Sequence, residues 1–296
     1  MKNNIEAYLV QLKKELAGCD RATIQDALSD AEEYLRNALA NLRETQPGVS
    51  EEAVIPSIME EYGTPIEIAQ AYRKIEARSS PSMIIRSRRD KPSWFIRFFY
   101  GVIDPGAWGA LLYLLFSLVT GILYFTWAVT GVSLSLSLLV LVIGIPFAGI
   151  FILSTRGLAL LEGRLVEALL GVRMPHRPLF SNTRPGLWNR LKALISDKYS
   201  WFTLVYMIMQ LPLGIIYFSV FITLIALSLY LVATPVLELS LGFPLFTFPD
   251  AQYYLNGWVM PIAVMAGILL FILTLHLAKI TGNLHGRLAK ALLVRK

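Results

Sequence analysis

The sequence predicts an all-α membrane protein in which a small helical domain precedes four transmembrane helices. Its composition is the first reason: 55% of the 296 residues are hydrophobic and only 16% are charged, which is typical of an integral membrane protein. Charge separation is the second. The head, residues 1–78, has 9 Lys/Arg against 14 Asp/Glu, whereas the body, residues 79–296, has 18 against 7. The third is an internal repeat at the entry to two long apolar runs.

The head contains the start and stop signals of four helices. Gly18 ends the first helix, and Asp20 is a suitable N-cap for a longer second helix. Ser50 caps the third helix, which Gly63 ends. Thr64–Glu67 has the pattern of a capping box with proline in the first helical position. We therefore expect a compact four-helix module with an acidic surface.

Three motifs of the head resemble the HAAS signalling domain. They are Asp-Ala-Glu-Glu-Tyr-Leu at 30–35, Ser-Glu-Glu-Ala at 50–53 and Tyr-Gly-Thr-Pro-Ile-Glu-Ile-Ala at 62–69. The resemblance covers about residues 4–75. It implies a cytoplasmic helical module joined to a membrane sensor region, with a protein partner such as a PadR-type transcription regulator. Charge alone favours an ordinary solvated face over a partner site.

A basic linker, residues 79–93, joins the head to the body at residues 94–296. Its arginines precede the first apolar run and are expected to contact anionic lipid headgroups: Arg86, Arg88 and Arg89. Such clusters mark the cytoplasmic side of a membrane. Aromatic residues from Trp94 onward indicate an amphipathic segment in the interface.

The body contains enough apolar sequence for four spans. No charged residue occurs from Pro105 to Thr155, a stretch long enough for two helices. The second apolar stretch contains only Glu238 and Asp250 before Lys279, so the segment around them is expected to be external. Both termini are then cytoplasmic. The expected spans are 107–130, 134–155, 201–231 and 258–278.

The repeat has two parts with different offsets. In the first part, seven residues recur 93 positions later: Asp104, Trp108, Tyr113, Leu118, Gly121, Tyr124 and Phe125 become Asp197, Trp201, Tyr206, Leu211, Gly214, Tyr217 and Phe218. In the second part, Gly163-Arg164-Leu165 recurs 123 positions later as Gly286-Arg287-Leu288. The larger offset implies an external insertion at about 233–257 in the second copy. Repeat one is then 94–172 and repeat two 187–296.

Each repeat contains two spans and ends on the side where it began. The copies are therefore expected to be parallel, related by an axis along the membrane normal, which argues against inverted-repeat transport. Asp104–Trp108, Gly144–Pro146 and Gly163–Leu165 resemble a sensor-type membrane domain over about residues 95–295. The resemblance implies a bacterial or archaeal cytoplasmic membrane and a signalling role.

Two matched pairs of residues are candidate contacts. Trp108 and Trp201 stand at equivalent membrane edges, where tryptophan usually anchors helix depth rather than a ligand. Arg164 and Arg287 occupy equivalent cytoplasmic positions. They are either ordinary positive-inside charge or contacts to lipid phosphate or to acidic residues of the head such as Glu32 and Glu33.

The insertion is the candidate ligand-binding segment. Its prolines, Pro235, Pro244 and Pro249, are expected to prevent a long helix. It is a lid over an apolar ligand or a loop on the bilayer surface. The candidate residues are Phe243, Phe246, Phe248, Tyr253 and Tyr254.

No motif indicates catalysis, a cofactor or a metal. Cys19 is the only cysteine, and the three histidines have no ligand spacing. We expect His276 and His285 to be interface residues and expect no charges at the span centres. An enzyme or an ion pump is therefore disfavoured, as is direct binding of nucleic acid, because the basic residues are interleaved with spans.

The favoured function is a membrane sensor or transducer that relays membrane state or an apolar ligand to a cytoplasmic protein. The alternatives are a structural or assembly subunit of a membrane complex and a lipid-handling enzyme or transporter. The sequence leaves open whether copies of the chain associate. Sensing is expected where the repeat symmetry fails, at the insertion and at Glu162, where the second copy has His285.

Overall fold

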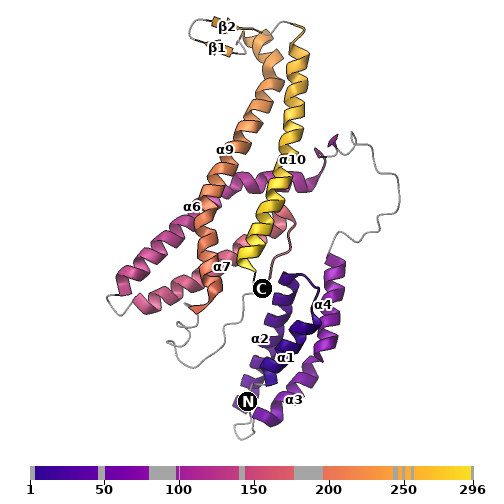
Figure 1. Ribbon diagram of the computed structural model, residues 1–296, viewed down its shortest axis with the longest axis vertical. Helices are drawn as coiled ribbons and strands as arrows, with labels where there is room; N and C mark the ends of the chain where they lie inside the picture. Colours follow the sequence, from indigo (N-terminus) through magenta and orange to yellow (C-terminus); the bar gives the residue numbers. More distant parts are fainter. Residues whose placement is uncertain are drawn as a thin grey trace, which may run out of the picture.

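The described part of the chain is helical apart from one short β-hairpin (Figure 1). A computed structural model describes residues 4–45, 51–79, 98–99, 101–139, 144–176, 196–242, 246–248, 251–254 and 257–294. The predicted all-α class is confirmed for these residues. Ser50 and the arginines of the basic linker lie outside them.

The head folds into the predicted helices α1 (Asn4–Glu15), α2 (Arg21–Thr45), α3 (Glu51–Tyr62) and α4 (Pro65–Ser79). Two of the expected caps are present. Asp20 Oδ1 accepts from the Ala22 amide at 2.9 Å. The Thr64 amide donates to Glu67 at 2.9 Å, and the Glu67 amide donates back to Thr64 Oγ1 at 3.3 Å. An apolar core holds the helices together: Ile5, Tyr8, Leu12, Leu16, Ala27, Ala31, Leu35, Ile55, Ile58 and Ala69.

Tyr8 links α1 to the turn between α3 and α4. Its hydroxyl donates to the carbonyl of Gly63 at 2.8 Å, and Gly63 has the positive φ of 108° that ends α3. Burial, with a smaller effect of Glu67, raises the pKa of Tyr8 to about 12. The folded state therefore retains the phenolic proton more tightly than the unfolded state does.

We expect Tyr8→Phe to lower the stability of the head by about 1 kcal/mol at neutral pH, because one hydrogen bond is lost. The stabilisation from the raised pKa is complete below a pH of about 10, the ordinary tyrosine value, and disappears as pH rises through the folded value. Thermal unfolding of the full chain followed by circular dichroism measures both effects. Tyr34→Phe, at an exposed ring, is the control. Identical alkaline profiles for wild type and Tyr8→Phe would contradict this account.

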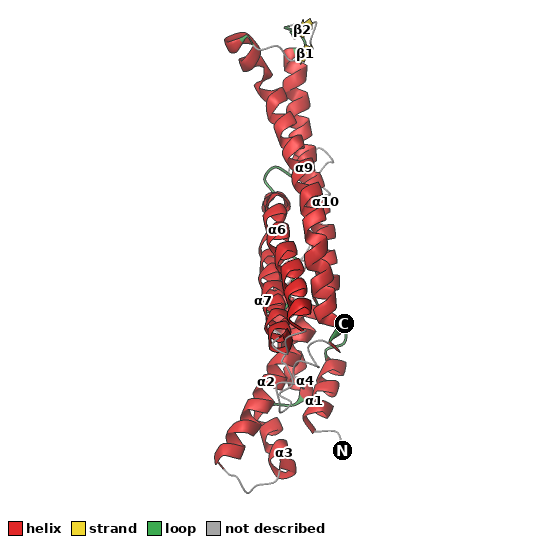
Figure 2. Cartoon of the chain, turned by 90° about the vertical axis from the view of Figure 1, so that its left-hand side faces the viewer, coloured by secondary structure: helices red, strands yellow, loops and turns green. Residues whose placement is uncertain are grey.

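The body consists of two helical hairpins that cross each other. One is α6 (Pro105–Leu139) with α7 (Gly144–Leu170), and the other is α9 (Lys198–Leu241) with α10 (Met260–Leu293). Figures 1 and 2 show that α9 and α10 extend well beyond the α6–α7 hairpin, away from the head. The C-terminal end of α10 lies beside the head.

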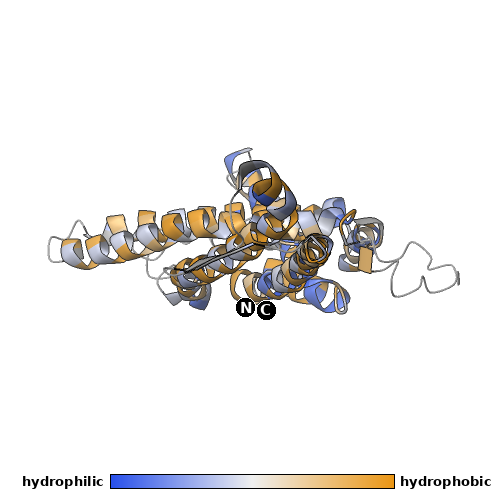
Figure 3. Cartoon of the chain, turned by 90° about the horizontal axis from the view of Figure 1, so that it is seen from above, coloured by the Kyte–Doolittle hydropathy of each residue, from blue (hydrophilic) through white to orange (hydrophobic). Residues whose placement is uncertain are grey.

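Three of these helices, α6, α9 and α10, are long and apolar enough to cross a membrane. Figure 3 shows hydrophobic residues along the long helices. Many large apolar side chains on them are exposed, including Leu123, Ile216 and Ile262. Helices of this kind are typical of a membrane protein, because lipid rather than protein covers such side chains.

The helix boundaries correct three sequence-based expectations. The expected turn after residue 130 is wrong, since α6 continues to Leu139. The second expected span, 134–155, is replaced by α7, one continuous helix that starts at Gly144 and carries charged residues from Arg156 onward, among them Glu162. Pro235 does not prevent a long helix, since it lies inside α9. Membrane helices tolerate such prolines because neighbouring groups satisfy the freed backbone.

The expected insertion is divided between two structures. α9 continues to Leu241 and ends at Gly242, whose φ is 67°. A hairpin of β1 (Phe246–Phe248) and β2 (Ala251–Tyr253) follows, with Phe246 opposite Tyr253. The hairpin lies at the end of the molecule opposite the head (Figure 1).

Candidate functional site

A cluster of polar side chains lies buried where the two helical hairpins cross. We call it the buried polar cluster, and all four long helices contribute to it: Tyr113 and Tyr124 from α6, Glu162 from α7, Tyr206 and Gln210 from α9, and His285 from α10. Each of these side chains is at most 2% exposed. Polar groups at such depth are costly unless they satisfy one another.

Glu162 is the acceptor at the centre of the cluster. Its Oε1 accepts from the hydroxyls of Tyr113 at 2.5 Å and Tyr206 at 2.7 Å. Its Oε2 accepts from the hydroxyl of Tyr124 at 3.0 Å. Three hydroxyl donors on one carboxylate satisfy most of its lone pairs.

His285 closes the network from the opposite side. Its Nε2 lies 2.8 Å from the Tyr113 hydroxyl and 3.1 Å from the Tyr206 hydroxyl. Because both phenolic protons are directed at Glu162, hydrogen-bond accounting assigns the proton of this contact to Nε2 of His285. His285 Nδ1 and Gln210 Oε1 are buried and have no hydrogen-bond partner within the described residues.

Two glycines bring α6 and α9 close enough to form the cluster. A Cβ at Gly121 would lie 2.7 Å from the carbonyl oxygen of Gln210, and one at Gly214 would lie 2.5 Å from that of Ser117. The two contacts are reciprocal, because Gln210 stands 93 residues after Ser117, the offset that aligns Gly214 with Gly121. Close approach of backbones at small residues is a common basis of helix packing in membranes.

Two ion pairs have the same reciprocal relation. Arg156 on α7 pairs with Asp197 at 2.7 Å, and Lys279 on α10 pairs with Asp104. Lys279 stands 123 residues after Arg156, the offset of the second part of the repeat. The hydrogen bond from Lys279 lowers the pKa of Asp104, so this carboxylate stays ionised. Each pair joins a residue of one predicted repeat to a residue of the other.

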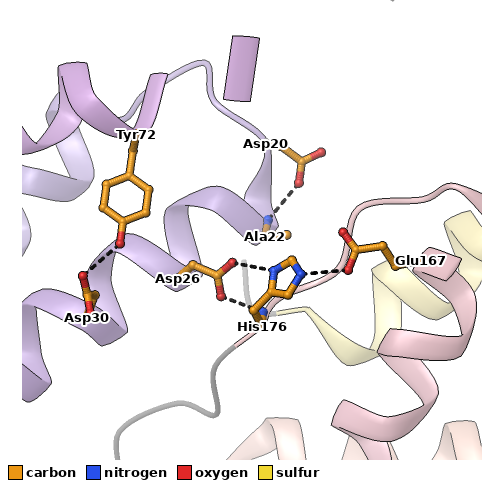
Figure 4. A network of polar contacts seen from close by, with 7 residues as sticks. All are labelled: Asp20, Ala22, Asp26, Asp30, Tyr72, Glu167 and His176. Atoms are coloured by element: carbon orange, nitrogen blue, oxygen red, sulfur yellow. Dashed lines mark hydrogen bonds and ion pairs between the residues drawn. The ribbon is translucent and has the colours of Figure 1, made fainter. Parts of the chain in front are cut away.

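The head contacts the body through two carboxylates of its α2 end. Asp20 pairs with Lys290 of α10. Asp26 accepts from the backbone amide of His176 at 2.8 Å and lies 3.4 Å from its Nδ1. The His176 Nε2 lies 3.1 Å from Glu167 of α7. Figure 4 shows the imidazole placed between the carboxylates of the head and the body.

The predicted contact residues occupy the following positions. Trp108 and Trp201 are exposed near the starts of α6 and α9, and their role as membrane anchors stays a prediction. Arg164 and Arg287 are exposed and, within the described residues, form no ion pair. Glu32 instead pairs with Arg36 of its own helix at 2.8 Å.

The ligand-binding prediction for the insertion is not tested by these positions. Tyr254 is exposed, and its hydroxyl lies 3.5 Å from the carbonyl of Gly242. Phe243 lies outside the described residues. Phe246, Phe248 and Tyr253 lie on the β-hairpin.

Most of the cluster was not predicted from the sequence. The expectation that His285 is an interface residue is wrong, since His285 is buried and contacts the Tyr113 hydroxyl. The available signal was the alignment itself, in which Glu162 and His285 break the symmetry while Tyr113 and Tyr206 preserve it. The residues of the cluster come from four different helices, so no local sequence motif contains them.

Comparison with known families agrees with this architecture. A family model described as "Putative sensor" matches residues 113–293, and a HAAS model matches residues 7–71. Neither a curated protein nor a solved structure matches the chain. The first match contains every residue of the buried polar cluster and covers more than half of the chain. The chain therefore belongs to the Sensor family and carries a HAAS domain ahead of its sensor domain.

Proposed function

We propose that this protein is a membrane sensor and transducer that relays a change in its membrane body to a cytoplasmic partner through the HAAS head. One observation carries the proposal. Two helices of the body each carry one cluster residue and one head-facing residue five positions later, Glu162 and Glu167 on α7 and His285 and Lys290 on α10. A rotation or shift of either helix at the cluster would therefore also displace the groups that hold the head.

The proposed topology has four spans, with both termini in the cytoplasm and two parallel two-span repeats. The excess of basic residues beside the head supports a cytoplasmic head. The paired contacts of Gly121 with Gly214, and of Arg156–Asp197 with Lys279–Asp104, support an axis along the membrane normal. The fourth proposed span is α7. Its charged residues can lie within the membrane where they pack against other helices, as Glu162 does.

The proposed output is a protein contact of the head, with a PadR-type transcription regulator as the leading partner class. The HAAS match supports a protein partner in general. A signal that loosens the head from the body would change which surfaces of α2 this partner can reach, since Asp20 and Asp26 lie there.

The test compares a basic residue that contacts the head with a nearby basic residue that does not. We expect Lys290→Glu to release the head, because it places a carboxylate against Asp20. Release is measured by disulfide cross-linking, in mild detergent, between Cys19 and a cysteine introduced in place of Leu293, which lines a pocket together with Gln25 of the head. Cross-linking yield should fall several-fold in Lys290→Glu.

Arg287→Glu is the matched control, since Arg287 is exposed on the same helix. Its yield should match that of the parent. Equal loss in both variants would show that general basic charge, rather than the Asp20–Lys290 contact, holds the head. Unchanged yield in Lys290→Glu would remove the proposed transmission route.

A lipid-handling activity is the second candidate, and the buried polar cluster is the observation that favours it. An intramembrane enzyme needs converging polar groups, and Glu162, His285 and the tyrosines supply them. We favour sensing because both proposed output contacts lie on the helices that carry Glu162 and His285. Turnover of added phospholipid by the purified chain, lost in Glu162→Gln, would reverse this preference.

A further inference from the structure

We propose that the buried polar cluster is a proton-binding site, in which Glu162 and His285 share one bound proton through the hydroxyls of Tyr113 and Tyr206. The ligand is a proton delivered by water. The binding step does not depend on the proposed function. Its consequence for the head does rest on that function.

The geometry places a complete hydrogen-bonded path between an acid and a base. From His285 Nε2, each path crosses one tyrosine hydroxyl, with 2.8 and 2.5 Å steps through Tyr113 and 3.1 and 2.7 Å steps through Tyr206. All four distances are short enough for proton exchange along hydrogen bonds. The two residues are thus connected twice, once through each of the helices α6 and α9.

Uptake of one proton takes two steps, and atoms and charge balance in each step. Before uptake, Glu162 is a carboxylate and His285 is neutral with its proton on Nε2. The added proton enters at the unpartnered Nδ1 of His285, which gives an imidazolium. The Nε2 proton can then pass to a tyrosine oxygen while the proton of that tyrosine passes to Glu162 Oε1. The product is a carboxylic acid and a neutral imidazole protonated on Nδ1, and the tyrosine is again neutral.

The side chains that face Glu162 and His285 come from α6 and α9. α6 contributes the hydroxyls of Tyr113 and Tyr124, and α9 contributes the hydroxyl of Tyr206 and the amide of Gln210. Tyr217 of α9 presents its ring to His285 at a centroid distance of 5.6 Å. Within the described residues no Lys or Arg contacts the pair. No fixed cation therefore offsets the negative charge of the Glu162 carboxylate.

Under the proposed function, protonation would reach the head through α7 and α10. Neutralising Glu162 weakens its hold on three tyrosine hydroxyls that come from α6 and α9. The position of α7 in the crossing then changes, and Glu167, which holds His176, moves with it. Proton binding and head release are separate measurements, so they can fail separately.

The experiment is an infrared pH titration of the full chain reconstituted in lipid nanodiscs. The C=O stretch of a protonated carboxyl group reports the acid form directly, and surface carboxylates stay largely ionised between a pH of about 5 and about 8. We expect a band that grows as pH falls through this window and is absent in Glu162→Gln. Glu167→Gln, on the same helix, is the matched control and should keep the band.

A second variant guards against misfolding of Glu162→Gln. Tyr113→Phe combined with Tyr206→Phe keeps both rings but removes both paths, so the band should titrate at a pH shifted by at least one unit. A pH-independent spectrum, or a band unchanged in folded Glu162→Gln, would overturn the proton site. A titrating band with pH-independent cross-linking of Cys19 to position 293 would keep the proton site and reject its link to the head.

Discussion

Gly121→Ala and Gly214→Ala are each expected to lower the stability of the membrane body by about 2 kcal/mol, as for overpacking of a dense core. An added methyl group would meet backbone rather than a movable side chain: the Gln210 carbonyl oxygen at 2.7 Å, or the Ser117 carbonyl oxygen at 2.5 Å. To relieve the overlap, α6 and α9 must separate. Separation would also lengthen the hydrogen bonds of Tyr113 and Tyr206 to Glu162.

The measurement is reversible unfolding of the full chain in mixed micelles with increasing denaturing detergent. Gly157→Ala is the control, because a Cβ at Gly157 meets nothing within 4 Å and alanine favours a helix interior. It should be neutral or slightly stabilising. The double variant should cost less than the sum of its parts, since one separation relieves both overlaps. Stability equal to wild type in both single variants would show that the helices do not cross as closely as described.

The sequence was sufficient for the head because its signals are local. Asp20, Gly63 and Thr64–Glu67 act on their own helix ends, and each acts where its pattern predicted. The repeat was equally readable as an alignment of residues. It identified Tyr113 with Tyr206 and singled out Glu162 against His285 before any contact was known.

The cluster was not predictable because a buried charged residue and the groups that hydrogen-bond to it lie on different helices. Charge placement alone ends a span at Arg156 and leaves Glu162 in a cytoplasmic segment. In the structure α7 continues through both residues, since Asp197 pairs with Arg156 and three tyrosines satisfy Glu162. A rule that counts charges cannot anticipate partners supplied by helices elsewhere in the sequence.

The same limit applies to the head contact. Arg164 and Arg287 are the arginines that the repeat singles out, yet both face outward. Lys290 and His176 make the contact instead. Lys290 faces the head because of the rotation of α10, and His176 does so because the chain passes beside α2 after α7 ends.

Exchanging the two unlike residues of the cluster is expected to restore much of the stability that either single change removes. Glu162→His leaves three tyrosine hydroxyls without their carboxylate acceptor, and His285→Glu places a second carboxylate beside the first. Each single variant should cost about 3–5 kcal/mol, the usual effect of breaking a buried charged network. The double variant again has one acid and one base, on opposite sides of the same two hydroxyls.

Recovery rests on the reciprocal positions of the tyrosines. Tyr113 and Tyr206 each contact both residues, so their hydroxyl protons can turn toward a carboxylate at position 285. Tyr217, which faces His285 with its ring, would take the place that Tyr124 has beside Glu162. A coupling energy of at least 2 kcal/mol in the double-mutant cycle is the expected result, measured by the same detergent unfolding.

The control cycle uses Glu167→Lys and Lys290→Glu, five residues further along the same helices. These residues contact different groups, His176 and Asp20, so their effects should add. Strong coupling at 162 and 285 with additivity at 167 and 290 would locate the interaction of the two repeats in the buried polar cluster. Additive losses at both pairs would mean that the tyrosines are fixed toward position 162, and a proton could not then pass between the two residues in the way proposed.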